Sequence, residues 1–228
     1  NSDLRSSLIL SAGMNQRLYG YLEQFEDFYP DEKGEIKKKI VLKVSDYRSA
    51  LIQGKFLAKK GLWISEYRIE SGLNCGGHTF PTDGYLMGPI LAEFRDKRED
   101  LIKFIHNIFV KALSRKGRSA PERELPVKIT AQGGVSTAEE HKFLINHYQL
   151  DSVGWGTPFL LVKETTAVDD ITLNKLIEAK EDDLYLSDIS PLNVPFNNLK
   201  GNTKGLEKLS YIDQGEPGSS GPRKYVVS

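Results

Sequence analysis

Strand-like and helix-like segments alternate along most of this 228-residue chain, and this alternation limits its fold more than any other feature. Short aliphatic runs are separated by amphipathic segments whose apolar residues recur at helical spacing. Parallel strands need long crossovers, which are usually helical. The pattern therefore predicts an α/β protein with a parallel sheet. The expected strands are 7–12, 39–45, 64–70, 127–131 and 152–155, and the expected helices are 16–28, 48–60, 84–94, 96–113, 136–148 and 172–179.

The alternating pattern ends near residue 182. The segment SDISPLNVPFNNLKGNTKG that follows is rich in Asn, Pro, Gly and Ser, and the last residues are rich in Gly and Pro. Such composition is typical of an ordered loop or a wrapping tail. The sequence therefore predicts an α/β portion over residues 1–180 and an irregular C-terminal tail over residues 181–228.

Composition excludes several classes of protein. Lys plus Arg and Asp plus Glu both number 31, which argues against binding nucleic acid or an anionic membrane through bulk charge. No apolar run reaches membrane-spanning length, and no signal peptide is visible. The single cysteine, Cys75, cannot form an internal disulfide. No His or Cys pair has metal-ligand spacing. We expect a cytoplasmic protein that acts on a small molecule and holds no metal.

Glycine-rich turns follow three of the expected strands. In parallel α/β proteins, ligands bind at the carboxyl ends of the strands, and in (β/α)₈ barrels the loops after the last two strands commonly hold a phosphate. Glycine lets backbone N–H groups approach an anion, and a helix N-terminus adds its dipole. The sequence predicts either a phosphate site or tight turns without a ligand. The site would use Gly133, Gly134, Gly156 and Thr157.

Three side chains near these turns are candidates for chemistry. His78 lies in the glycine-rich loop 70–78, and a neutral imidazole near pH 7 suits a general base. The alternative is a loop histidine that bonds to the backbone. Glu70 ends one strand and is a candidate to orient His78, and Lys43 ends the preceding strand and is a candidate to contact the ligand. The other histidines, His106, His141 and His147, are expected at solvated helix positions.

The motifs resemble a known family when they are taken in order. They are Lys43-Val44 ending a strand, Gly61 ending a helix, Glu70 before Gly76-Gly77-His78, Pro126-Val127 leading to Ala131-Gln132-Gly133-Gly134-Val135, and Gly156-Thr157-Pro158-Phe159-Leu160. This series resembles the nitronate monooxygenase (2-nitropropane dioxygenase) family, whose relatives include the flavin-type enoyl-ACP reductases. A more distant resemblance extends to the flavin domain of glutamate synthase. The resemblance covers roughly residues 39–180.

The resemblance implies an FMN-dependent oxidoreductase with the fold of a TIM barrel. Its flavin phosphate would lie on the four turn residues given above, and Lys43, Gly76 and Gly77 would contact the cofactor. His78 would be the active-site base and would remove a proton α to a nitro group or assist at the flavin face. The flavin would perform the redox chemistry, while the protein would position the reactants.

The sequence departs from the family pattern in three places, one of which is that the segment 79–125 is longer than the family's usual helix. Leu73-Asn74-Cys75 lengthens the glycine-rich loop, which makes Asn74 and Cys75 candidates to line the pocket. The family's first strands and their glycine-rich flavin contacts have no counterpart here. We therefore expect only the C-terminal part of a barrel. Because a half barrel exposes unpaired strand edges, an earlier part of a longer chain, another domain, or another subunit such as a second copy would complete it.

Two other functions fit the same residues. The first is a flavin-free TIM-barrel enzyme, a lyase or isomerase, that binds a phosphorylated substrate through the same two turns. The second is a non-catalytic barrel fragment that serves as an interaction domain of a larger protein. A flavin spectrum favours the oxidoreductase, colourless binding of a phosphate compound favours the lyase or isomerase, and a stable complex with another polypeptide favours the interaction domain.

Overall fold

A computed structural model describes residues 3–70, 87–133, 135, 137–165, 168–187 and 196–218. The chain divides into two compact units, residues 1–157 and 158–228. This division comes earlier in the chain than the boundary at residue 180 expected from the sequence.

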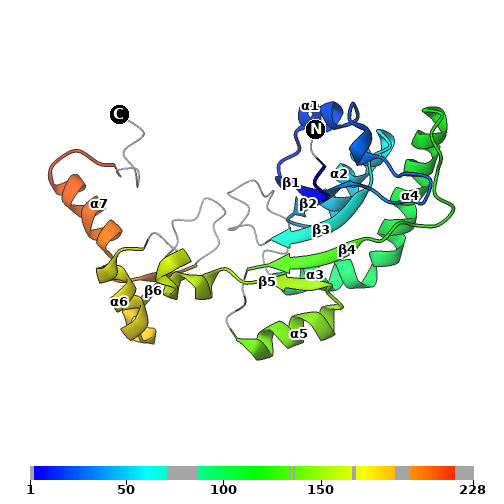
Figure 1. The fold of residues 1–228 in the computed structure, drawn as a ribbon. Helices are drawn as coiled ribbons and strands as arrows, with labels where there is room; N and C mark the ends of the chain where they lie inside the picture. The colour runs from blue at the N-terminus through cyan, green and yellow to red at the C-terminus, as the bar shows by residue number, and fades with distance from the viewer. Residues whose placement is uncertain are drawn as a thin grey trace. The chain divides into compact units, whose positions relative to one another are not determined.

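The first unit is built on a parallel sheet of five strands. They are β1 (Ser6–Leu10), β2 (Lys38–Val44), β3 (Ile64–Glu70), β4 (Lys128–Gln132) and β5 (Ser152–Gly154), and they lie in the order β1-β2-β3-β4-β5 (Figure 1). The α/β class and the parallel sheet are thereby confirmed. A doubly wound sheet reverses its strand order partway, whereas this order follows the chain throughout. Within the described residues the strands form an open sheet.

Helices connect these strands, and their ends carry the expected signals. They are α1 (Gln16–Leu22), the short 3₁₀ turn η1 (Glu26–Phe28), α2 (Tyr47–Lys59), α3 (Met87–Asp96), α4 (Arg98–Arg115) and α5 (Ala138–Tyr148). The Asp46 side chain caps α2 by accepting from the Ser49 N–H at 2.6 Å. Gly61, at a φ of 74°, ends α2 while the Leu62 N–H bonds to the Leu57 carbonyl. This is a Schellman motif, as the sequence predicted.

The hydrophobic core lies between one face of the sheet and helices α2, α3 and α4. The sheet contributes alternate residues, because successive side chains of a strand point to opposite faces. The helices contribute residues three or four positions apart. Among the buried contributors are Ile40, Leu42, Val44, Tyr67, Ile69 and Ile129 from the strands and Leu57, Leu91, Phe94, Leu101, Ile105 and Phe109 from the helices.

Two tyrosine hydroxyls inside this core differ in their hydrogen bonding. The hydroxyl of Tyr19 donates to Gln53 Oε1 at 2.7 Å, and burial raises the pKa of Tyr19 to about 12. Gln53 in turn donates to the Ala12 carbonyl at 2.9 Å. By contrast, the hydroxyl of Tyr67 is buried without a hydrogen-bond partner among the described residues, and burial raises its pKa above the usual value. It lies against Gly54 of α2.

The second unit contains the helix expected near residues 172–179 and several further regular elements, some of them where the sequence predicted an irregular tail. They are the 3₁₀ turns η2 (Thr157–Leu161, which begins at the last residue of the first unit), η3 (Lys163–Thr165) and η4 (Glu181–Asp183), the helices α6 (Asp170–Glu178) and α7 (Thr203–Asp213), and the antiparallel strands β6 (Leu184–Ser187) and β7 (Phe196–Leu199). Helix α7 begins where the Asn202 side chain accepts from the Gly205 N–H at 2.8 Å. The expectation of an irregular tail over residues 181–228 was wrong for η4, β6, β7 and α7.

Asp169 gives the second unit a stability that depends on pH. Its carboxylate accepts from the Thr203 hydroxyl at the start of α7 and from the Thr172 N–H in the first turn of α6, and these bonds lower its pKa from 3.8 to about 2. A lowered pKa in the folded state stabilises the protein above the ordinary carboxyl pKa, and this stabilisation disappears as the pH falls from about 4 to about 2. We expect amide hydrogen exchange in α6 and α7 to accelerate over that range.

The matched variant for this prediction is Asp169→Asn. Asparagine is also a good N-cap, so α6 keeps its start, but it carries no titratable charge. The variant should lose part of the acid dependence of exchange in these two helices. An acid profile identical to that of the wild type would contradict the assignment to Asp169.

Candidate functional site

The face of the sheet opposite the core carries polar side chains. Val41 is in register with Glu66, Lys43 with Arg68, and Glu70 with Gln132, so these residues share one face. Sequence reasoning treated β3 as a buried strand and gave no role to Arg68, Glu66 or Thr130. The alternation of charged and apolar residues in 66–70 was the signal that could have shown this face.

Lys43 and Glu70 meet at the carboxyl edge of this face, a contact that sequence reasoning did not predict. The Lys43 Nζ lies 3.3 Å from Glu70 Oε2. The Glu70 side chain is only 5% exposed, whereas that of Lys43 is 28% exposed. A buried carboxylate needs a nearby cation, so the ammonium compensates the charge of Glu70. The Lys43 side chain is therefore the more exposed member of this pair.

A second polar group links β3 to β4 in the middle of the same face. Glu66 Oε1 accepts from Arg68 Nε and Nη2, both at 2.9 Å, and from the Thr130 hydroxyl at 2.8 Å. Charge-assisted bonds of this kind hold side chains in fixed positions. These bonds therefore fix the Glu66, Arg68 and Thr130 side chains on the same face of the sheet as Lys43 and Glu70.

The turns after β4 and β5 lie side by side. Gly133 has a φ of 87°, which agrees with the expected need for glycine, and its N–H donates to the Gly154 carbonyl at 3.1 Å. This N–H is thus part of the link between the two turns. Gly156 lies in open space, since an added Cβ would meet no atom within 4 Å. Gly156 is therefore the most accessible of the described glycines in the two turns.

Gln132 is a residue at this edge that sequence reasoning missed. A Cβ added at Gly154 would lie 3.2 Å from Gln132 Cγ, so the absence of a side chain at Gly154 makes room for the glutamine. Gln132 lies between Glu70 and Gly154 in the register of the sheet. Its place directly before the Gly133-Gly134 pair was the available signal.

Helix α5 starts beside these turns with a capping box. The Thr137 hydroxyl accepts from the Glu140 N–H at 3.2 Å, and the Glu140 carboxylate accepts from the Thr137 N–H at 3.0 Å. Thr137 is thus the N-cap. Glu139 and Glu140 both lie in the first turn, so two carboxylates already use part of the helix dipole. The dipole of α5 alone is therefore a weak argument for anion binding.

Two of the three described histidines, His106 and His141, differ from the solvated positions expected for them. His141 is partly buried and accepts a hydrogen bond at Nδ1 from Trp155 Nε1 at 2.9 Å. His106 is partly buried against Trp63, and its Nδ1 has no partner among the described residues. Only His147 is exposed, where it stacks on Phe143. The solvated assignment was therefore wrong for His141 and His106.

Several predicted site residues lie outside the described residues. Gly76, Gly77 and His78 belong to residues 71–86, which also contain Asn74 and Cys75, and Gly134 is a further such position. For Thr157 only the backbone is described, at the start of η2. The roles proposed for these residues stay predictions.

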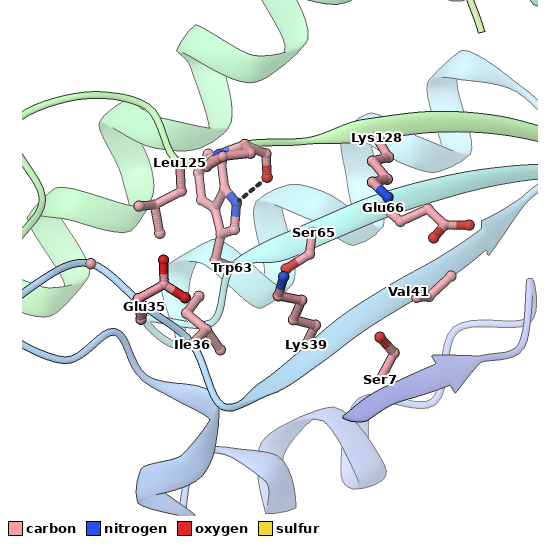
Figure 2. A pocket seen from close by; sticks show the side chains of 12 residues that line it. Ser7, Glu35, Ile36, Lys39, Val41, Trp63, Ser65, Glu66, Leu125 and Lys128 are labelled. Atoms are coloured by element: carbon pink, nitrogen blue, oxygen red, sulfur yellow. Dashed lines mark hydrogen bonds between the residues drawn. The ribbon is translucent and has the colours of Figure 1, made fainter. Parts of the chain in front are cut away.

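A cavity of about 270 Å³ opens at the other end of the sheet, near the amino ends of the strands. Figure 2 shows Lys39 of β2, Glu66 of β3 and Lys128 of β4 around it, with the Trp63 indole donating to the Pro126 carbonyl at 3.3 Å. No residue at the carboxyl edge lines this cavity. In barrels this end of the strands serves stability, whereas the carboxyl end carries the chemistry.

The described residues contain neither a membrane-spanning helix nor a cluster of metal ligands. None of the helices in this part of the chain is both long and apolar enough to cross a lipid bilayer. Among the same residues, no group of three or more His, Cys, Asp or Glu side chains is placed to hold a metal ion.

Comparison with known proteins identifies a similar fold but no family. No protein-family model matches the chain, and no curated protein matches it. The fold is similar to the crystal structure of the enoyl reductase domain of MlnA from the macrolactin biosynthesis cluster of Bacillus amyloliquefaciens. The TM-score is 0.56 at 15% sequence identity, over 92% of this chain and 48% of that one. The present chain thus spans about half the length of that domain's chain, and identity this low shows the fold alone.

Proposed function

We propose that the first unit is part of a (β/α) barrel of TIM type. Its parallel strands follow one another in chain order, which is how a barrel is wound. The edge strand β1 exposes Leu8 and Ile9, which are 37% and 50% exposed. Further strands paired to β1 and β5 would cover these residues and enclose the polar face as the barrel interior. An earlier segment of a longer chain, another domain or another subunit would supply those strands.

We further propose that the barrel is an FMN-dependent oxidoreductase related to nitronate monooxygenases. The observation that carries this proposal is the carboxyl edge, where the Lys43–Glu70 pair lies on the same side of the sheet as the paired turns of Gly133 and Gly156. The resemblance in sequence includes flavin-type enoyl-ACP reductases among the relatives. The solved structure with a similar fold is an enoyl reductase domain, which agrees with that class.

The described residues fit a flavin mononucleotide in two respects. Open space around Gly156 lets a phosphate approach the backbone, and the partly exposed Lys43 side chain offers a positive charge to an electron-rich ring edge. Gly134 and Thr157 would complete the phosphate site, and Gly76 and Gly77 would lie against the cofactor. The flavin, when bound, supplies the electron transfer.

The protein's own residues then hold one another and the reactants in position, and they transfer protons. Glu70 holds the Lys43 ammonium at the carboxyl edge, and the Glu66–Arg68–Thr130 group fixes the strands beneath it. His78 would take the proton from the carbon next to an electron-withdrawing group of a small substrate. In this proposal Glu70 is a positioning residue, because its charge is already matched by Lys43.

The test is an absorption spectrum of the purified protein after FMN addition and desalting. Retained flavin bands support the proposal. Binding of phosphate compounds without flavin would favour the lyase or isomerase. A protein that binds neither, but forms a stable complex with another polypeptide, would favour an interaction domain.

Lys43→Met should weaken FMN binding by about tenfold, because it removes a charge-assisted contact worth roughly 1.5 kcal/mol. The matched control is Lys39→Met, which lies on the same strand but lines the cavity at the other end. Fluorescence quenching of free FMN measures both affinities. Equal losses in the two variants would contradict a direct role for Lys43.

A further inference from the structure

The turn after β5 is tied to helix α5 by one side-chain hydrogen bond. Trp155 Nε1 lies 2.9 Å from His141 Nδ1, and the two rings are 6.1 Å apart between centroids. Both side chains are partly buried. Trp155 lies between Gly154, whose carbonyl accepts from the Gly133 N–H, and Gly156, which lies in open space.

The bond requires one protonation state of His141. An indole N–H only donates, so Nδ1 must provide a lone pair, and the proton of the neutral imidazole is on Nε2. An imidazolium has two donors and cannot accept this bond. Among the described residues, α5 itself carries Glu139, Glu140 and Lys142. Helix α3 presents Arg95 to His147 at the far end of α5, and residues 152–157 carry no ionisable side chain.

We propose that neutral His141 is a positioning residue that holds the Trp155 turn in the conformation that binds the phosphate group. Glycines flank Trp155 on both sides and restrict the backbone little. The indole bond is thus the contact that fixes the direction of the Gly156 backbone. A binding loop that is held in its bound conformation loses less entropy when the ligand binds. This inference rests on the proposed FMN-binding function.

Variants of His141 separate the acceptor from the rest of the side chain. His141→Asn places an oxygen near the position of Nδ1 and keeps an acceptor that does not titrate, whereas His141→Leu removes the acceptor. His147→Leu on the exposed side of the same helix is the matched control. Loss of a neutral hydrogen bond should weaken FMN binding about fivefold to tenfold in His141→Leu, and less than about twofold in His141→Asn and His147→Leu.

The Trp155 indole N–H signal in a ¹H–¹⁵N spectrum tests the positioning without any ligand. The chain has two tryptophans, and Trp155→Phe assigns the signal. We expect a hydrogen-bonded shift for this signal in the wild type. His141→Asn should keep a hydrogen-bonded shift, and His141→Leu should give the free-indole shift.

The two measurements distinguish a failure of the positioning role from a failure of the proposed function. An indole signal unaffected by His141→Leu would overturn the positioning role, and so would FMN affinity equal to that of the wild type in that variant. A wild-type protein that binds no FMN would instead overturn the proposed function. The indole signal would then still decide whether His141 holds the turn.

Discussion

Gly54→Ala should lower the free energy of unfolding by about 2 kcal/mol, although alanine is the better helix former. An added Cβ on Gly54 would overlap the Tyr67 hydroxyl and would lie 3.0 Å from Ile105 Cδ1. Overpacking of a core costs about 1–3 kcal/mol, and here the obstructing atom belongs to a fully buried side chain. The gain in helix propensity returns only about 1 kcal/mol. Urea unfolding followed by circular dichroism measures the difference.

Tyr67→Phe should rescue this variant. The Tyr67 hydroxyl has no partner among the described residues, so removing it should leave stability unchanged or raise it by about 1 kcal/mol. In the Tyr67→Phe background the Cβ of residue 54 gains room, and Gly54→Ala should become nearly neutral. A double-mutant cycle gives the coupling between the two sites.

Gly20→Ala provides the control for helix propensity. An added Cβ there would meet Lys60 Nζ at 3.5 Å, which is ordinary contact with a flexible side chain. This variant should be stabilised by about 1 kcal/mol in either background. If Gly54→Ala is equally destabilising in the wild type and in the Tyr67→Phe background, steric overlap with the hydroxyl is not the cause.

The first unit could be predicted from the sequence because its local signals agree with one another. Strand β3 has the bounds that its pattern predicted, residues 64–70, and α4 buries the expected apolar face. Asp46 and Gly61 mark the ends of α2 as cap preferences require. Each of these features depends on a few neighbouring residues, so tertiary context had little to change.

The elements beyond residue 182 were missed because composition dominated the interpretation. The segment before α7 is rich in Asn, Gly and Pro, yet Asn202 is a good N-cap and Gly201 has a positive φ of 60°. The same residue types that indicate a loop therefore also begin a helix. A helical spacing of Leu206, Leu209 and Ile212 was available as the deciding signal.

The candidate site was predictable in its position but not in its hydrogen bonds. Lys43 and Glu70 were expected at the ends of successive strands, but sequence reasoning did not predict the contact between them. The hydrogen bond from the Gly133 N–H to the Gly154 carbonyl depends on the register of β4 and β5. The sequence does not specify this register for such short strands. The bond between His141 and Trp155 likewise needs the tertiary arrangement.

His78→Ala should reduce turnover by at least about a hundredfold if His78 is the general base. The segment that carries it leaves β3 directly after Glu70, whose side chain lies at the carboxyl edge with Lys43. Loss of a base that acts only in proton transfer should lower kcat while FMN retention stays unchanged. Steady-state assays with nitroalkanes and with enoyl thioesters, on flavin-loaded protein, measure this effect.

Two comparisons separate a base from a structural histidine in this experiment. Added imidazole should restore part of the activity of His78→Ala, because a small base can occupy the space that the side chain leaves. His147→Ala, at an exposed position of α5, should retain the wild-type rate. An unchanged kcat in His78→Ala would remove the assignment. A hundredfold loss that is accompanied by loss of flavin would instead make His78 a residue that binds the cofactor.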